Sequence, residues 1–113
     1  MTQTSAAGDL AFGIFDWIDH NANLSLADTY EQRLRMLEVA DETGFFCYHM
    51  AEHHGTPLAV APTPNMFLAA ASQRTTRLRL GPLVQLLPLY NPLRNIEDVC
   101  ILDHLTNGRL VIL

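Results

Sequence analysis

The chain has 113 residues, 49% of them hydrophobic and 17% charged, with a formal net charge of −5 at pH 7. That length suits one domain with a modest core. All seven cations are Arg and form no basic stripe, which excludes nucleic acid as the main partner. No apolar run approaches the ~18 residues of a membrane span. Residues 1–9 lack the basic and apolar regions of a secretory signal, so we expect a flexible arm there and a cytoplasmic protein.

Strand and helix patterns alternate along the first half of the chain. Residues 10–18 are apolar and aromatic, which predicts a buried strand of a parallel sheet. Ser25 stands three residues before Asp28, a capping-box spacing, and begins a helix whose apolar residues recur at helical spacing. Gly44 is placed to end that helix. Residues 45–52 then predict a second strand.

The next unit follows a proline-rich loop. Residues 66–74 contain strong helix formers, and residues 78–87 predict a third strand. Gly81 and Pro82 interrupt this strand, and a proline cannot donate to a sheet ladder. We therefore expect the third strand to bulge or bend at this point.

A third helix and a fourth strand complete the pattern. Asn91 is a favourable N-cap followed by Pro92 at the first helical position, and an Asn-Gly pair at 107–108 ends the helix. Residues 109–113 predict a fourth strand. A complete domain rarely ends on a wholly apolar, unpaired strand. The sequence therefore predicts an α/β fold of about four parallel strands and three helices, which is one piece of a larger fold.

A cluster of ionisable residues ends the second predicted strand. Glu52, His53 and His54 follow an apolar, aromatic run and precede turn residues. Parallel α/β proteins carry their reactive groups where strands end. Strand alternation places Glu52 and His54 on one side and His53 on the other. Histidine is suited to proton transfer near neutral pH, so the cluster is a candidate catalytic rim.

Two other interpretations of this cluster remain. His49 to His53 matches the zinc motif H-x-x-E-H, which requires a helix, where residues four apart lie about 6 Å from each other. On a strand the same side chains are about 13 Å apart at ~3.3 Å per residue, so we expect no metal site. The other interpretation is purely structural, with all three ionisable groups satisfied by hydrogen bonds at the strand end.

Several segments in order carry a family resemblance, including FGIFDWID, GFFCYHMAEHH, RLRLG, LPLYNPLR and LDHLTNGRL. From about residue 11 the chain resembles the N-terminal part of the bacterial luciferase-like flavin-dependent monooxygenases. The resemblance implies the N-terminal portion of a (β/α)8 TIM barrel over residues 10–113, incomplete and truncated in strand 4. It also implies an enzyme that uses reduced FMN and O2 on a small organic substrate, with a separate flavin reductase as a partner. Some branches of the family use the deazaflavin F420 instead.

The resemblance also assigns roles to residues. His53 matches a position implicated in catalysis, and Glu52 and His54 become supporting rim residues. A cis peptide between Leu83 and Val84 is implied beside the flavin ring. The remaining residues implied in cofactor binding lie at strand ends, and the whole set is Leu83, Val84, Pro82, Ile14 and Phe15.

The resemblance has departures and gaps. His49 stands where luciferase has Trp, and Asn91 replaces a usual His. Four of eight strands cannot close a barrel, so we expect the 113-residue chain to be inactive alone. The alternative function is a non-catalytic half-barrel that self-associates as a homo-oligomer or aggregates through its open edges.

Overall fold

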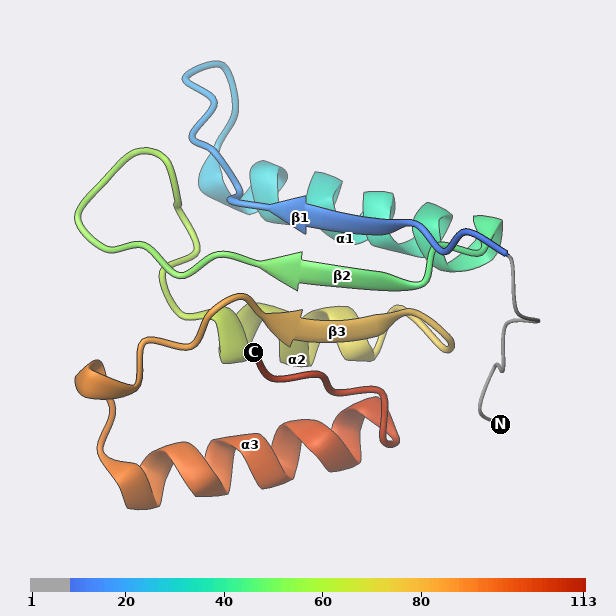
Figure 1. Cartoon of the computed structure of the whole chain (residues 1–113). Coiled ribbons are helices and arrows are strands. Elements are labelled where there is room, and N and C mark those ends of the chain that lie inside the picture. Colours follow the sequence, from blue (N-terminus) through green and yellow to red (C-terminus); the bar gives the residue numbers. More distant parts are fainter. Residues whose placement is uncertain (1–8) are drawn as a thin grey trace.

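The computed structural model of the chain describes residues 9–113, so the expected arm lies outside the described residues except for Asp9. The elements in order are β1 Gly13–Asp16, α1 Leu26–Thr43, β2 Cys47–Met50, α2 Pro64–Ser72, β3 Arg79–Pro82, a 3-10 turn η1 Leu87–Leu89 and α3 Pro92–Thr106. The three strands form one parallel sheet in the order β1-β2-β3. In Figure 1, α1 and α2 lie behind this sheet, and α3 lies beyond β3. This arrangement confirms the predicted partial α/β fold.

The helix ends follow the local signals in the sequence. The Ser25 hydroxyl accepts a hydrogen bond from the Asp28 backbone N–H at 3.0 Å and donates to the Asp28 carboxylate at 2.6 Å. Gly44 ends α1 with φ of 88°, a left-handed conformation that favours glycine. The Asn91 side chain accepts from two amides in the first turn of α3, and Asn107 ends that helix in the left-handed conformation. The caps of α1 and α3 are confirmed, whereas α2 begins two residues earlier than predicted, at Pro64.

The fourth strand is shorter than predicted. The C-terminal segment makes one parallel bridge, between Leu80 and Leu110, through Leu80 N–H to Arg109 O at 3.1 Å and Val111 N–H to Leu80 O at 2.9 Å. A Cβ on Gly81 would lie 1.6 Å from the Val111 carbonyl oxygen. The segment therefore passes over the backbone of β3 at Gly81 instead of lying fully beside it, which limits the pairing to one bridge.

The irregularity predicted in the third strand is present. The strand β3 ends at Pro82. Just beyond it, the peptide bond between Leu83 and Val84 is cis. This is the bond at which the family resemblance implied a cis peptide. The strand therefore stops five residues before the predicted end at residue 87.

One face of the sheet carries the core. Ile14, Tyr48 and Leu80 are in register across the strands and pack with apolar residues of the helices, namely Leu37, Ala40, Phe67, Leu68, Ala71 and Leu102. The opposite face, which we call the open face, has Phe15, His49 and Gly81 in register. Phe15 is 52% exposed there. Among residues 9–113, helices thus cover the sheet on one side only.

The amino edge of the sheet is held by a buried carboxylate. Asp41, near the end of α1, accepts from the backbone N–H groups of Thr76, Arg77 and Leu78 at 3.0, 2.7 and 2.6 Å. Burial would raise the pKa of Asp41, but these three N–H donors outweigh it and the pKa is lowered. The carboxylate thereby joins α1 to the loop that leads into β3. Within residues 9–113 no helix is long and apolar enough to cross a membrane.

Candidate active site at the carboxyl edge of the sheet

The three parallel strands end at one edge, which we call the carboxyl edge. β1 ends at Asp16, β2 at Met50 and β3 at Pro82, and these residues are in register. The arrowheads of all three strands point to this edge in Figure 1. Glu52, His53 and His54 follow β2 after one intervening residue, Ala51, so the predicted cluster lies at the edge where parallel α/β proteins place their sites.

Glu52 and His54 form a pair. The Glu52 side chain is only 1% exposed, and its Oε1 lies 2.8 Å from Nε2 of His54, whose side chain is 48% exposed. The second oxygen, Oε2, accepts from the backbone N–H of Leu86 at 3.0 Å. Burial, and then the neighbouring Glu52 carboxylate, raise the pKa of the Tyr90 phenol. Glu52 is therefore occupied by protein partners on both of its oxygens.

His53 has a different environment. Its ring lies against the indole of Trp17, with 5.9 Å between ring centroids and 39° between planes. The Trp17 ring in turn meets Phe15 edge to face, at 6.0 Å and 90°. The His53 side chain is exposed and makes no hydrogen bond to another residue within 9–113. No residue within 9–113 bonds to its ring nitrogens. His53 and His54 therefore have different partners, as predicted, although both lie beyond the end of β2 at Met50, so strand alternation is not the cause.

Trp17 is a candidate site residue that the sequence reasoning missed. It is 41% exposed and is the single Trp of the chain. The signal that could have found it is its position at the end of the first apolar strand, because β1 and β2 are neighbours whose ends meet at one edge. A long-range ring contact with His53 has no local sequence signature.

The backbone on both sides of Trp17 is held firmly. Asp16 accepts from the Ile18 N–H at 3.0 Å and from the Tyr48 hydroxyl at 3.0 Å, and Arg33 pairs with it at 2.9 Å. Ile18 is fully buried with φ of 49°, which is unusual for a β-branched residue. Burial, followed by the Asp16 carboxylate, raises the pKa of the Tyr48 phenol. These contacts fix the place from which Trp17 meets His53.

The residues implied in cofactor binding divide into two groups. Ile14 packs against the core on the helix-covered face, and Pro82 is buried at the end of β3. Phe15 lies on the open face, and Val84 is 48% exposed just beyond the carboxyl edge. Leu83 is half-buried, and its N–H donates to the Met50 carbonyl at 2.8 Å. The structure therefore makes Phe15 and Val84 accessible and leaves Ile14 and Pro82 in the covered layer.

The zinc motif is not formed. His49 lies in the strand β2, so His49 and His53 are not on one helical face. Among residues 9–113 there is no group of three His, Cys, Asp or Glu side chains arranged to hold a metal ion. The Nδ1 atom of His49 is buried on the open face without a hydrogen-bond partner among these residues. The Oε1 atom of Gln85, three residues beyond β3, is also buried and has no partner among them.

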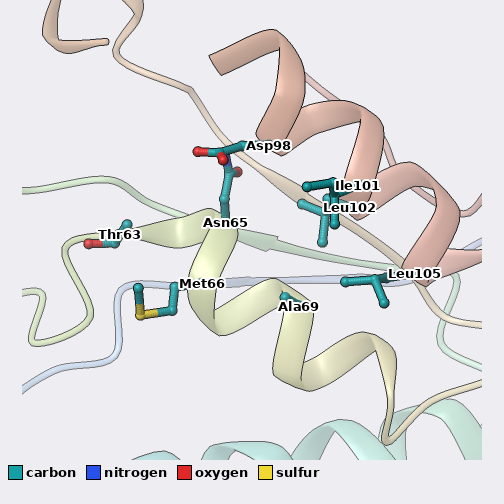
Figure 2. A pocket seen from close by; sticks show the side chains of 8 residues that line it. All are labelled: Thr63, Asn65, Met66, Ala69, Asp98, Ile101, Leu102 and Leu105. Carbon is teal, nitrogen blue, oxygen red and sulfur yellow. The ribbon is translucent and has the colours of Figure 1, made fainter. Parts of the chain in front are cut away.

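A separate groove lies between two helices, away from the carboxyl-edge cluster. Figure 2 shows the side chains that line it, on α2 and α3. Its volume is about 200 Å³. It is lined mainly by apolar side chains, from Thr63, Asn65, Met66, Ala69, Asp98, Ile101, Leu102 and Leu105. None of the predicted site residues lines this groove.

Comparison with known proteins places this chain in a family. The luciferase-like monooxygenase family matches residues 10–113. This chain belongs to that family. Limonene 1,2-monooxygenase of Rhodococcus erythropolis is 35% identical over 108 residues, which cover 96% of this chain and 28% of that enzyme. The uncharacterized protein y4wF of Sinorhizobium fredii is 53% identical over 100 residues, covering 88% of this chain and 29% of that protein. The chain thus spans less than a third of the length of these curated relatives.

Solved structures agree with the family assignment. Monooxygenase RslO1 from Streptomyces bottropensis matches with a TM-score of 0.85 and 34% identity, over 91% of this chain and 32% of that one. Two others share the fold at 21% identity. They are the oxygenating constituent of 3,6-diketocamphane monooxygenase from Pseudomonas putida in complex with FMN, with a TM-score of 0.85, and an F420-dependent tetrahydromethanopterin reductase from Methanopyrus kandleri, with a TM-score of 0.72. They cover 92% of this chain and 29% and 26% of their own chains, respectively.

Proposed function

We propose that this chain supplies the first β/α units of a flavin-dependent monooxygenase that acts on a small organic substrate with reduced FMN and O2. The observation that carries the proposal is the contrast at the carboxyl edge. His53 lies beside Trp17 with imidazole nitrogens that no residue within 9–113 bonds, while Glu52 and His54 are paired with each other. Membership of the luciferase-like monooxygenase family supports the reaction class.

The residues of this chain fit a flavin at the carboxyl edge. The apolar side chain of Val84 is accessible, and the buried Nδ1 of His49 lacks a partner that a polar ligand atom could provide. When bound, reduced FMN would supply the electrons that activate O2. In this proposal Leu83 and Val84 pack against the flavin ring. His53 holds or donates a proton at one of its own imidazole nitrogens. Phe15 and Trp17 exclude water from the reacting groups.

We propose that the activity requires β/α units beyond those described. In the part of the chain that the structure describes, three strands and one bridge leave the open face and the outer edge of β1 without a covering helix or strand. The chain alone should therefore bind FMN weakly and show no turnover. We also propose that in the complete cytoplasmic enzyme a separate reductase supplies the reduced flavin.

A chimera tests this function. Residues 10–113 would replace the matching segment of the Rhodococcus limonene 1,2-monooxygenase, with which they are 35% identical. The chimera should bind FMN and consume O2 with reduced FMN and limonene, whereas the 113-residue chain should not. Circular dichroism checks that both proteins fold. A folded chimera that neither binds FMN nor consumes O2 would contradict the proposal, and turnover by the isolated chain would contradict the need for further units.

The cofactor alternative is F420, because the Methanopyrus reductase that uses it shares this fold. We propose FMN, since the family match over residues 10–113 is to luciferase-like monooxygenases. Titrating the same chimera with FMN and with F420 separates the two. Tighter binding of F420 would reverse the choice.

A second function is a half-barrel that self-associates. The observation favouring it is exposed apolar surface: Phe15 lies on the open face, and Leu93, Ile96 and Ile101 are exposed on α3. Apolar surface of this kind marks interaction sites or aggregation. Size-exclusion chromatography with light scattering distinguishes a defined assembly from aggregation. A defined dimer that melts cooperatively would support assembly, and a monomer would argue against it.

A further inference from the structure

Glu52 is a buried carboxylate whose partners come from two different segments. Its side chain is 1% exposed, and its two oxygens contact His54 Nε2 at 2.8 Å and the Leu86 N–H at 3.0 Å. Tyr90 lies near the same carboxylate. A buried carboxylate without hydrogen bonds is strongly unfavourable. Its contacts therefore fix the position of whatever groups supply them.

The segment that contains Leu86 runs from residue 83 to residue 90 and connects β3 to α3. Two hydrogen bonds tie it to β2 and its rim within the described part of the chain, Leu83 N–H to Met50 O at 2.8 Å and Leu86 N–H to Glu52. The other backbone bonds of residues 87–90 are local turns. Glu52 is thus the one side chain of the β2 rim that holds the middle of this segment.

We infer that Glu52 is a positioning residue for the proposed flavin site, an inference that rests on the proposed function. With one oxygen it holds segment 83–90, and so places Leu83 and Val84 beside the β2 rim. With the other oxygen it orients His54. Because both oxygens are occupied, the carboxylate does not compete for the neighbouring His53, which stays free for a ligand. This role explains why an acid precedes the two histidines.

Hydrogen exchange on the full 113-residue chain tests the link without any flavin. Glu52→Ala removes the acceptor, and Leu86→Pro removes the donor at a residue whose φ of −78° suits proline. Each should speed exchange of the Leu89 and Tyr90 amides by about 10- to 100-fold, the range for a hydrogen bond to a charged group. The amides of the double variant should exchange no faster than those of either single variant, because both substitutions remove the same hydrogen bond, from Leu86 N–H to Glu52.

Matched controls separate this link from general destabilisation. Leu86→Ala keeps the N–H and should leave exchange within about threefold, and Glu97→Ala removes an exposed carboxylate and should have no effect. Glu52→Gln keeps one carbonyl oxygen and should restore most of the protection, which also covers the case in which Glu52→Ala does not fold. Unchanged exchange rates in Glu52→Ala would overturn the inference. So would a double variant whose rate increase equals the product of the two single increases.

A second measurement connects the link to the site. In the chimera described above, Glu52→Ala should raise the Kd for FMN by about 10-fold or more, and Glu52→Gln should raise it less. NMR resonances of the His54 ring should move in Glu52→Ala and stay in place in Leu86→Pro. FMN binding unchanged by Glu52→Ala overturns the inference alone. No FMN binding by the unsubstituted chimera overturns the proposed function, and the exchange data still report whether Glu52 holds the segment.

Discussion

Replacing Asp41 by Asn tests how much the Asp41 carboxylate, at the amino edge of the sheet and away from the proposed site, contributes to the free energy of unfolding. The carboxylate is buried and accepts three backbone N–H groups and the Thr76 hydroxyl. Its Oδ1 serves Arg77 and Leu78, and its Oδ2 serves Thr76. Asn keeps one uncharged acceptor in place of the first oxygen and turns an amino group toward Thr76, where two donors then face each other.

The expected loss is large for one atom. Hydrogen bonds to a charged group contribute about 1.5–3 kcal/mol each, and those of one carboxylate are not additive, so Asp41→Asn should cost roughly 2–4 kcal/mol. For a chain of this size that lowers Tm by roughly 10 °C. The exposed neighbour Glu42 provides the matched control, and Glu42→Gln should change Tm by less than about 2 °C.

The pH dependence of the difference has a definite sign. The folded chain lowers the pKa of Asp41 below its ordinary value. The stabilisation is therefore fully present above the unfolded pKa of about 3.9 and is lost as pH falls through the folded pKa. Thermal melts at neutral pH and at successively more acidic pH should show the wild-type and Asp41→Asn curves converging toward acid. A difference under 1 kcal/mol at neutral pH, or one that grows in acid, would refute the reasoning.

Three further substitutions have expected results. Gly81→Ala places a methyl group 1.6 Å from the Val111 carbonyl oxygen; it should cost about 1–3 kcal/mol and speed exchange of the Val111 amide, and a stability equal to wild type would contradict the close approach. Trp17→Leu should shift the His53 ring resonances in NMR and cost about 0.5–1.5 kcal/mol of stability from the ring contact. Trp17→Phe should cause a smaller shift and a smaller loss of stability. Unmoved His53 resonances in Trp17→Leu would disprove the contact. Asn91→Ala removes the cap of α3 and should cost about 1 kcal/mol by chemical denaturation, with no change in the slope of the transition.

Local signals in the sequence were sufficient for the ends of two helices, but not for the lengths of the strands. Ser25 and Gly44 bound α1 as predicted, and Asn91 bounds α3, because each residue type meets a backbone requirement of its own turn. Gly81 and Pro82 predicted an irregularity in the third strand because proline lacks an N–H, but the end of the strand at Pro82 comes five residues earlier than predicted. The length of the fourth strand did not follow, since it depends on how Val111 approaches β3 in space.

The candidate site was predictable in part. Strand alternation predicted that His53 lies apart from Glu52 and His54. The structure has Glu52 and His54 paired, but these residues lie beyond the end of β2 at Met50, so the contact is not a consequence of alternation. The ring contact with Trp17 joins residues 36 positions apart (53 − 17). The bond from Leu86 to Glu52 joins residues 34 positions apart. Such contacts are set by which strands are neighbours, so no local pattern contains them.

The most direct test of the central claim compares the two adjacent histidines in the limonene monooxygenase chimera. His53→Gln removes the imidazole that has free nitrogens, and His54→Gln removes the imidazole paired with Glu52. Oxygen uptake with reduced FMN and limonene should fall roughly 100-fold or more in kcat in the first variant. It should fall by less than about 10-fold in the second, because a glutamine amide can still bond to the carboxylate. Equal losses, or a larger loss for His54→Gln, would contradict the assignment of His53 as the catalytic residue.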